Sequence, residues 1–205
     1  MLTDRQLFFI NLAQTNDAPL ALEITKAEGI YLYDVTGKKY MDLISGISVS
    51  NTGHRHPEVV KAIKAQTDKY LHLMVYGEYI QSPQVQLAGK LAGLLPDSLN
   101  NCYFVNSGSE AVEGALKLAK RYTGRKKIVA FKHAYHGSTH GSLSVIGDPA
   151  YQEPFGPLLP GVEHITFNAI HELNTITNET ACVIIEPVQG EAGIIEATPS
   201  FINAL

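Results

Sequence analysis

The chain has 205 residues, of which 45% are hydrophobic and 18% are charged, and its formal net charge is −4. A chain of this length and composition can bury the core of one large domain, or of a domain with an arm. The mild acidity argues against a nucleic-acid-binding protein, because such proteins usually carry a basic face. The sequence contains no apolar window of about 18 or more residues, so no membrane span is expected.

The cysteines and the N-terminus indicate the compartment. The first residues lack a basic stretch followed by an apolar core, and they therefore do not predict a signal peptide. Cys102 and Cys182 lie in or beside apolar runs, which is typical of buried, reduced thiols. We therefore expect a cytoplasmic protein.

The first half of the chain predicts an α+β segment. Residues 1–18 read as an arm with a short helix. Residues 22–43 alternate apolar and polar positions around two glycine turns, which predicts short antiparallel strands. Residues 57–70 and 82–95 have helical spacing, and each begins with a proline at or near the first helical position. Ser82 is expected to cap the second of these helices.

The second half predicts an open α/β sheet. Short apolar runs alternate with helices or loops, as is typical of strands buried on both faces of a mostly parallel sheet. Near the end of the chain, Ser200 is expected to cap a further helix. The four predicted strands are residues 102–105, 128–131, 164–167 and 181–186.

One turn predicts an anion site. Residues 104–120 read FVNSGSEAVEGALKLAK, in which Ser107 and Glu110 have the spacing of a capping box. The first N–H groups of a helix have no partner within the helix, and its dipole end is positive. Gly108 leaves room for a ligand, and Ser109 adds a hydroxyl. The turn therefore predicts a phosphate cradle, with an ordinary capped helix as the alternative.

The helix that follows this turn has a well-defined apolar face. Its inner stripe is predicted to face the sheet, and Glu113 and Lys117 are expected to form an i, i+4 ion pair on the outer side. The stripe consists of Val112, Ala115, Leu116 and Ala119.

Two further polar stretches follow predicted strands. Residues 131–141 read FKHAYHGSTHG, and residues 183–193 read VIIEPVQGEAG. Open α/β sheets bind ligands at the carboxyl ends of their strands, and an aromatic side chain there can stack on a flat ring. The glycine patterns of mononucleotide and dinucleotide sites do not occur. We therefore expect a smaller phosphate-bearing cofactor. His133, His136 and His140 have no cysteine or carboxylate beside them, so no metal site is expected.

Taken together, these stretches resemble the class III pyridoxal-phosphate aminotransferases, the group of ornithine, acetylornithine and 4-aminobutyrate transaminases. The resemblance covers the whole chain. It rests on four motifs in order: GIYLYDVTGKKYMDLISGISVSNTGHRHPEVVKAI, NSGSEAVEGALKLAKRYTGR, YHG and EPVQGEAG.

The resemblance implies the α/β fold of PLP-dependent transferases of fold type I, in incomplete form. Residues 1–50 would be an N-terminal arm and a small-domain segment, and residues 51–205 the first part of the PLP-binding large domain. The family builds its active site at a dimer interface, so a homodimer is expected.

The resemblance also assigns residues to pyridoxal 5′-phosphate. Gly108 and Ser109 would bind its phosphate, with Ser107 supporting the turn. Tyr135 would stack on the pyridine ring, and His136 would lie beside the ring.

Three further residues receive roles in the cofactor and substrate sites. Glu186 would support the pyridine-nitrogen side of the cofactor. Glu191 would be a gate carboxylate that pairs with an arginine for the substrate carboxylate. Ile47 occupies a position where ornithine transaminases carry tyrosine, which argues against plain ornithine as the amino donor.

The implied function is transamination between an amino donor, expected to be an ω-amino compound, and a 2-oxo acid such as 2-oxoglutarate. Family members are roughly twice as long as this chain. The Schiff-base lysine and the aspartate of the pyridine nitrogen are therefore expected beyond residue 205, and this chain alone is expected to be inactive. Two alternatives stay open: a non-catalytic binding or dimerisation module, and an aminomutase or decarboxylase on the same scaffold.

Overall fold

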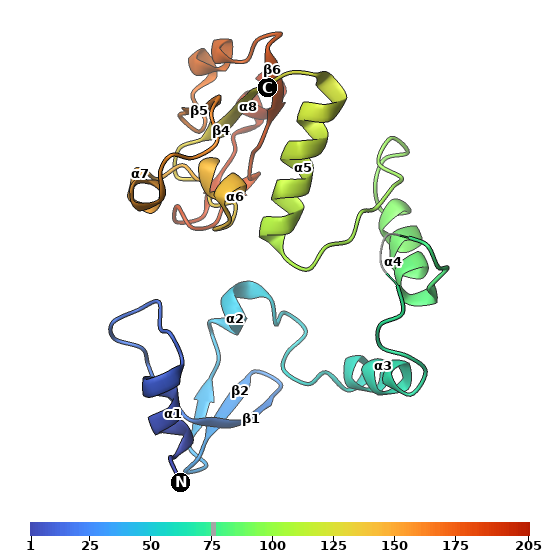
Figure 1. The fold of residues 1–205 in the computed structure, drawn as a ribbon, viewed down its shortest axis with the longest axis vertical. Coiled ribbons are helices and arrows are strands. Elements are labelled where there is room, and N and C mark those ends of the chain that lie inside the picture. Colours follow the sequence, from blue (N-terminus) through green and yellow to red (C-terminus); the bar gives the residue numbers. More distant parts are fainter. Residues whose placement is uncertain (75–76) are drawn as a thin grey trace. The chain divides into compact units, whose positions relative to one another are not determined.

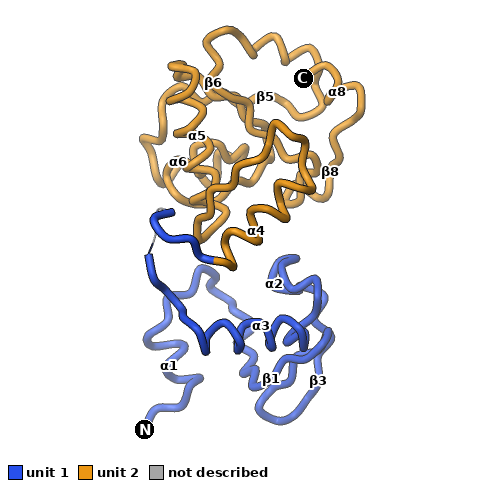
Figure 2. The backbone as a smooth tube through the Cα atoms, turned by 90° about the vertical axis from the view of Figure 1, so that its right-hand side faces the viewer, with its two compact units in different colours: residues 1–81 blue, residues 82–205 orange. Residues whose placement is uncertain are grey.

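The computed structural model describes residues 1–74 and 77–205. The chain forms two compact units, Met1–Gln81 and Ser82–Leu205 (Figure 2). Residues 51–81 group with the first unit, and the domain division after residue 50 remains a prediction about the complete protein. Within the described ranges, no helix combines the length and hydrophobicity that a membrane crossing requires.

The first unit contains a three-stranded antiparallel sheet, as the alternating pattern predicted (Figure 1). Gly29 and Gly37 lie in the turns with φ of 58° and 83°, a region that favours glycine. Thr3 caps the helix before the sheet through its side chain. The elements are α1 (Asp4–Asn11), β1 (Ile24–Glu28), β2 (Tyr31–Asp34) and β3 (Lys39–Met41).

Two helices follow the sheet. α2 (Ser45–Ser48) is irregular, because Gly46 and Ile47 have positive φ inside it. α3 (Pro57–Thr67) confirms the first predicted helix and begins at its proline. His54 Nε2 lies 2.7 Å from Asp42 Oδ2, which ties the loop before α3 to the end of β3.

The second unit is built around a parallel sheet with the order β5-β4-β6. The central strand β4 (Lys127–Phe131) pairs in parallel with β5 (Val162–Ile165) and with β6 (Thr180–Val183). Helix α5 (Gly108–Thr123) packs against β6 and against the short α6 (His140–Ser144). The remaining elements are α4 (Ser82–Ala92), α7 (Pro149–Gln152), η1 (Glu153–Phe155), η2 (Ile170–Thr175), β7 (Val188–Gln189), β8 (Ile195–Glu196) and α8 (Pro199–Ala204).

The core lies on both faces of β4, as expected for a central parallel strand. Side chains alternate between faces along a strand. Ile128 and Ala130 pack with Leu116 of α5, whereas Val129 and Phe131 pack on the opposite face. On that face, the rings of Phe131, Phe167 and Phe201 meet edge to face with centroids 5.6 to 5.8 Å apart.

Two predictions about elements are wrong. Residues 102–105 form no strand, since no strand among the described residues pairs with them. Ser200 does not cap the last helix. Thr198 does, by accepting a hydrogen bond from the Phe201 N–H at 3.3 Å, because α8 begins at Pro199.

Candidate active site

The turn before α5 has free donors and open space. Ser107 is the N-cap and accepts a hydrogen bond from the Glu110 N–H at 3.1 Å. The Glu110 carboxylate accepts from the Asn106 N–H at 2.6 Å, so the Ser107 half of the predicted capping box is present and only the return hydrogen bond is shifted by one residue. The N–H groups of Gly108 and Ser109 have no acceptor within the described part of the chain. A Cβ added to Gly108 would meet no atom within 4 Å.

The loop after β4 lies directly on this turn. The Ser138 N–H donates to Ser109 Oγ at 3.3 Å, although the two residues are 29 positions apart. Gly137 is buried between them with φ of 116°. A Cβ at Gly137 would collide with Ser109 Oγ, so only glycine permits this approach.

The loop is also tied to the segment after β6. The Tyr135 N–H donates to Glu186 Oε2 at 3.0 Å, and the Tyr135 side chain stays 44% exposed. The structure thus brings together the ends of two neighbouring strands and the start of α5. Of the sequence-predicted cofactor residues, Ser109, Tyr135 and Glu186 are connected through this loop.

His136 is half-buried in the same loop. Its Nε2 is shielded from solvent and has no hydrogen-bond partner among the residues described, and the same holds for Nε2 of His164 on β5. Burial lowers the pKa of His136. The Glu186 carboxylate acts in the opposite direction, and His164 adds to the lowering. The imidazole is therefore mostly neutral at pH 7, so one ring nitrogen is a donor and the other an acceptor.

The sequence did not identify Glu113 as part of this region. The predicted outward ion pair with Lys117 is wrong. The Glu113 carboxylate instead accepts hydrogen bonds from Thr139 Oγ1 at 2.6 Å, the Gly141 N–H at 2.8 Å and the Ser142 N–H at 3.3 Å. Its i, i+4 spacing from Ser109 was the available signal, because it places both side chains on one helix face.

The two sequence-predicted substrate residues are both exposed. Ile47 belongs to the first unit, where its side chain is 75% exposed and its φ is 60°. Glu191 lies in the turn between β7 and β8 of the second unit. Their substrate roles remain predictions.

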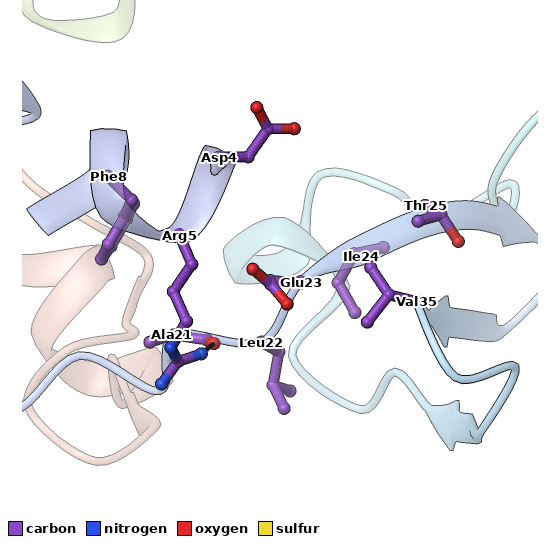
Figure 3. A pocket seen from close by; sticks show the side chains of 9 residues that line it. All are labelled: Asp4, Arg5, Phe8, Ala21, Leu22, Glu23, Ile24, Thr25 and Val35. Atoms are coloured by element: carbon purple, nitrogen blue, oxygen red, sulfur yellow. Dashed lines mark hydrogen bonds between the residues drawn. The ribbon is translucent and has the colours of Figure 1, made fainter. Parts of the chain in front are cut away.

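Two cavities lie among the described residues of the first unit, and neither is lined by a sequence-predicted site residue. In the cavity of about 390 Å³ between α1 and β1, Figure 3 shows Arg5 reaching toward Ala21, whose carbonyl accepts its hydrogen bond at 3.0 Å. That cavity is lined by Asp4, Arg5, Phe8, Ala21, Leu22, Glu23, Ile24, Thr25 and Val35. The second, of about 440 Å³, is lined by Glu28, Arg55, Pro57, Val60, Lys61 and Lys64.

Sequence comparisons identify similar enzymes. The chain is 46% identical over 185 residues to a [LysW]-aminoadipate semialdehyde/glutamate semialdehyde transaminase of Sulfolobus acidocaldarius, covering 90% of this chain and 47% of that protein. It is 41% identical over 183 residues to an acetylornithine aminotransferase of Methanopyrus kandleri, covering 89% of this chain and 46% of that protein. The chain therefore spans about half the length of the curated relatives it matches.

Solved structures have the same fold. An adenosylmethionine-8-amino-7-oxononanoate aminotransferase of Methanocaldococcus jannaschii matches with a TM-score of 0.88 and 31% identity, over 98% of this chain and 50% of that one. A taurine:2-oxoglutarate aminotransferase of Bifidobacterium kashiwanohense, solved with PLP and glutamate, matches with a TM-score of 0.87 and 28% identity, over 97% of this chain and 50% of that one. The fold is that of PLP-dependent transferases of fold type I.

The family model described as aminotransferase class-III matches residues 12–205. Enzymes of this family depend on PLP. Because the match extends over nearly all of the sequence, and the strand ends meet as the fold requires, the chain belongs to the class-III aminotransferase family.

Proposed function

We propose that this chain is the part of a PLP-dependent transaminase that holds the cofactor, and that the complete protein transfers an amino group from an ω-amino donor to a 2-oxo acid such as 2-oxoglutarate. One observation carries the proposal. The free N–H groups at the start of α5, the loop after β4 and the carboxylate after β6 meet at one edge of the parallel sheet, where open α/β folds bind ligands.

The phosphate of the cofactor would bind at the start of α5. The unpaired N–H groups of Gly108 and Ser109 are donors at the positive end of a sixteen-residue helix. Ser109 Oγ, which already accepts from the Ser138 N–H, can donate its own hydrogen to a phosphate oxygen. Ser107 holds the turn in shape through its cap.

The pyridine ring would lie against the loop after β4. The Tyr135 side chain is 44% exposed and would stack on the ring, and the neutral His136 lies beside it. Glu186 fixes the Tyr135 backbone and supports the pyridine-nitrogen side. When bound, PLP supplies the electron sink for the substrate carbanion. The residues of this chain bind and orient the cofactor.

The remaining chemistry requires groups that we expect downstream of Leu205. A lysine that binds PLP covalently and moves the substrate proton, and an aspartate for the pyridine nitrogen, would come from the second half of the complete protein. That half would also supply the arginine that pairs with Glu191. A homodimer would complete the site.

The names of the relatives guide the choice of donor. An acetylornithine aminotransferase and a [LysW]-aminoadipate semialdehyde/glutamate semialdehyde transaminase are among them. Ile47, rather than a tyrosine, agrees with such a donor better than with free ornithine. We therefore propose acetylornithine as the first donor to test.

The test uses the full-length protein that carries this sequence. The protein is incubated with PLP, 2-oxoglutarate and either acetylornithine or ornithine, and glutamate and the remaining products are measured by mass spectrometry. We expect glutamate, with acetylornithine as the better donor. An isomerised or decarboxylated product without glutamate would reject transamination. Absence of PLP binding would reject the cofactor site and favour a binding module.

A further inference from the structure

Two side chains one turn apart on α5 hold consecutive parts of the loop after β4. Ser109 and Glu113 are spaced i, i+4 and therefore share one face of the helix. Ser109 Oγ accepts from the Ser138 N–H, and Glu113 accepts from Thr139 and the residues after it. The loop is thus fastened along the first two turns of the helix that carries the proposed phosphate site.

The Glu113 carboxylate accepts three hydrogen bonds from the loop. One carboxylate oxygen, Oε1, accepts from the Thr139 hydroxyl and from the N–H groups of Gly141 and Ser142 at the start of α6. Burial raises the pKa of Glu113, but the three hydrogen bonds and the charge of Lys117 outweigh burial, so the pKa lies below its usual range. The carboxylate is therefore charged at neutral pH, which strengthens each hydrogen bond it accepts.

The close approach depends on two glycines that have the same spacing as the two helix residues. A Cβ at Gly137 would collide with Ser109 Oγ, and a Cβ at Gly141 would collide with the Glu113 carboxylate. Gly137 and Gly141 are both buried. The pattern S-x-x-x-E on the helix therefore fits against G-x-x-x-G on the loop.

We propose that Glu113 is a positioning residue, which fixes the loop of residues 135–142 on α5 so that Ser109 and the loop backbone stay arranged around the phosphate of the cofactor. Glu113 acts through the loop and touches neither cofactor nor substrate. This inference rests on the proposed function, because it presumes that the phosphate binds at the α5 turn.

The experiment compares two ligands that differ in the phosphate. Dissociation constants of PLP and of pyridoxal, which lacks the phosphate, are measured on the full-length apoprotein by absorbance titration. Their ratio reports the contribution of the phosphate site. We expect Glu113→Ala to lower the preference for PLP roughly tenfold, about the effect of one hydrogen bond to a charged group. Glu113→Gln keeps one acceptor oxygen, so this variant should lose less of the preference for PLP.

Matched controls separate positioning from general stability. Glu163→Gln removes a carboxylate that pairs with Lys127 on the neighbouring strand, and it should leave the preference unchanged. Thr139→Val removes one of the three donors to Glu113, whereas Thr139→Ser keeps the hydroxyl. The serine variant should retain the preference and the valine variant should lose part of it, which allows a decision even if Glu113→Ala does not fold.

The outcomes distinguish the two proposals. If the unmodified protein binds PLP no better than pyridoxal, the phosphate site of the proposed function is wrong. If the unmodified protein prefers PLP and the Glu113 and Thr139 variants keep the full preference, Glu113 is merely structural and the present inference is overturned, while the proposed function stands.

Discussion

Gly141 lies at a position where a side chain has no room. It is buried at the start of α6, and an added Cβ would collide with the Glu113 carboxylate. We expect Gly141→Ala to lower the free energy of unfolding by about 1–3 kcal/mol, the usual effect of overpacking a closed site. Urea denaturation of the full-length protein measures this change.

Gly114 is the matched control for this substitution. It lies inside α5, its φ is not positive, and no described atom lies within 4 Å of an added Cβ. Alanine is the better helix former, so Gly114→Ala should stabilise the protein by about 0.5–1 kcal/mol. Equal effects of the two substitutions would contradict the close contact between the loop and α5.

The half-buried histidines predict a loss of stability at mildly acidic pH. Burial lowers the pKa of both His136 and His164 from the ordinary 6.5, and backbone hydrogen bonds with Ile146 and Val145 offset only part of this effect at His164. Well above pH 6.5 these histidines are neutral in both states. As the pH falls below 6.5, the unfolded chain takes up protons that the folded chain does not, so folding weakens until the pH reaches the folded pKa values.

His164→Gln should reduce this pH dependence. We expect the melting temperature of the variant to fall less between pH 7 and about pH 5 than that of the unmodified protein. The comparison uses the change of melting temperature with pH rather than the melting temperature itself, since glutamine also changes packing. His171→Gln, at a side chain that is 83% exposed, should keep the original slope. If the melting temperature of His164→Gln changes with pH as much as that of the unmodified protein, His164 does not cause the pH dependence.

At the scale of elements, Asp34 organises the turn between β2 and β3. Its Oδ1 accepts from the Thr36 N–H at 2.9 Å, the Thr36 hydroxyl at 2.7 Å and the Lys38 N–H at 3.0 Å. Its Oδ2 accepts from the Tyr40 hydroxyl at 2.8 Å. The Thr36 hydroxyl is the main cause that lowers the pKa of Asp34 to about 2. The stability that the ionised Asp34 contributes through these hydrogen bonds is fully present above its ordinary pKa of 3.8. It is lost as the pH falls through the folded pKa of about 2.

Asp34→Ala should therefore loosen the hairpin at neutral pH. We expect faster amide hydrogen exchange at Thr36 and Lys38, because both N–H groups lose their acceptor. Asp17→Ala removes an exposed carboxylate elsewhere in the same unit and serves as the control. Unchanged exchange at both positions would mean that the turn holds its shape without the carboxylate.

The elements that were predictable from sequence are those determined locally. The antiparallel strands follow from period-two alternation and from glycines at the turns, and β4 follows from a short apolar run. The cap at Ser107 follows from side-chain chemistry within three residues. A cap is a contact between near neighbours, so its pattern is visible in the sequence.

The predictions that were wrong concern interactions with partners that are far away in the sequence. Residues 102–105 have a strand-like composition, but a strand requires a neighbour for its hydrogen bonds, and the described residues supply none. Glu113 was expected to face outward with Lys117, yet three donors between 26 and 29 positions away bind it more completely than one lysine would. The link from Tyr135 to Glu186 spans 51 positions and joins the segments that follow the neighbouring strands β4 and β6.

At the scale of the molecule, we propose that the chain supplies the cofactor-holding side of the site and that the Schiff-base lysine belongs to the other half of the complete protein. Lys132, the lysine closest in sequence to Tyr135, donates to Thr166 Oγ1 at 3.2 Å. Lys127 pairs with Glu163 at 3.0 Å. Both are thus occupied by contacts with or beside β5.

We therefore expect the 205-residue chain by itself to form no glutamate from PLP, acetylornithine and 2-oxoglutarate. Proton transfer and covalent attachment of the cofactor need an amine held at the reacting carbon, and positioning of the phosphate and ring cannot replace it. The full-length protein at the same concentration is the positive control, measured by mass spectrometry of the products. Turnover by the isolated chain would mean that one of its own lysines reaches the cofactor. The proposal that the second half of the protein supplies the Schiff-base lysine would then be wrong.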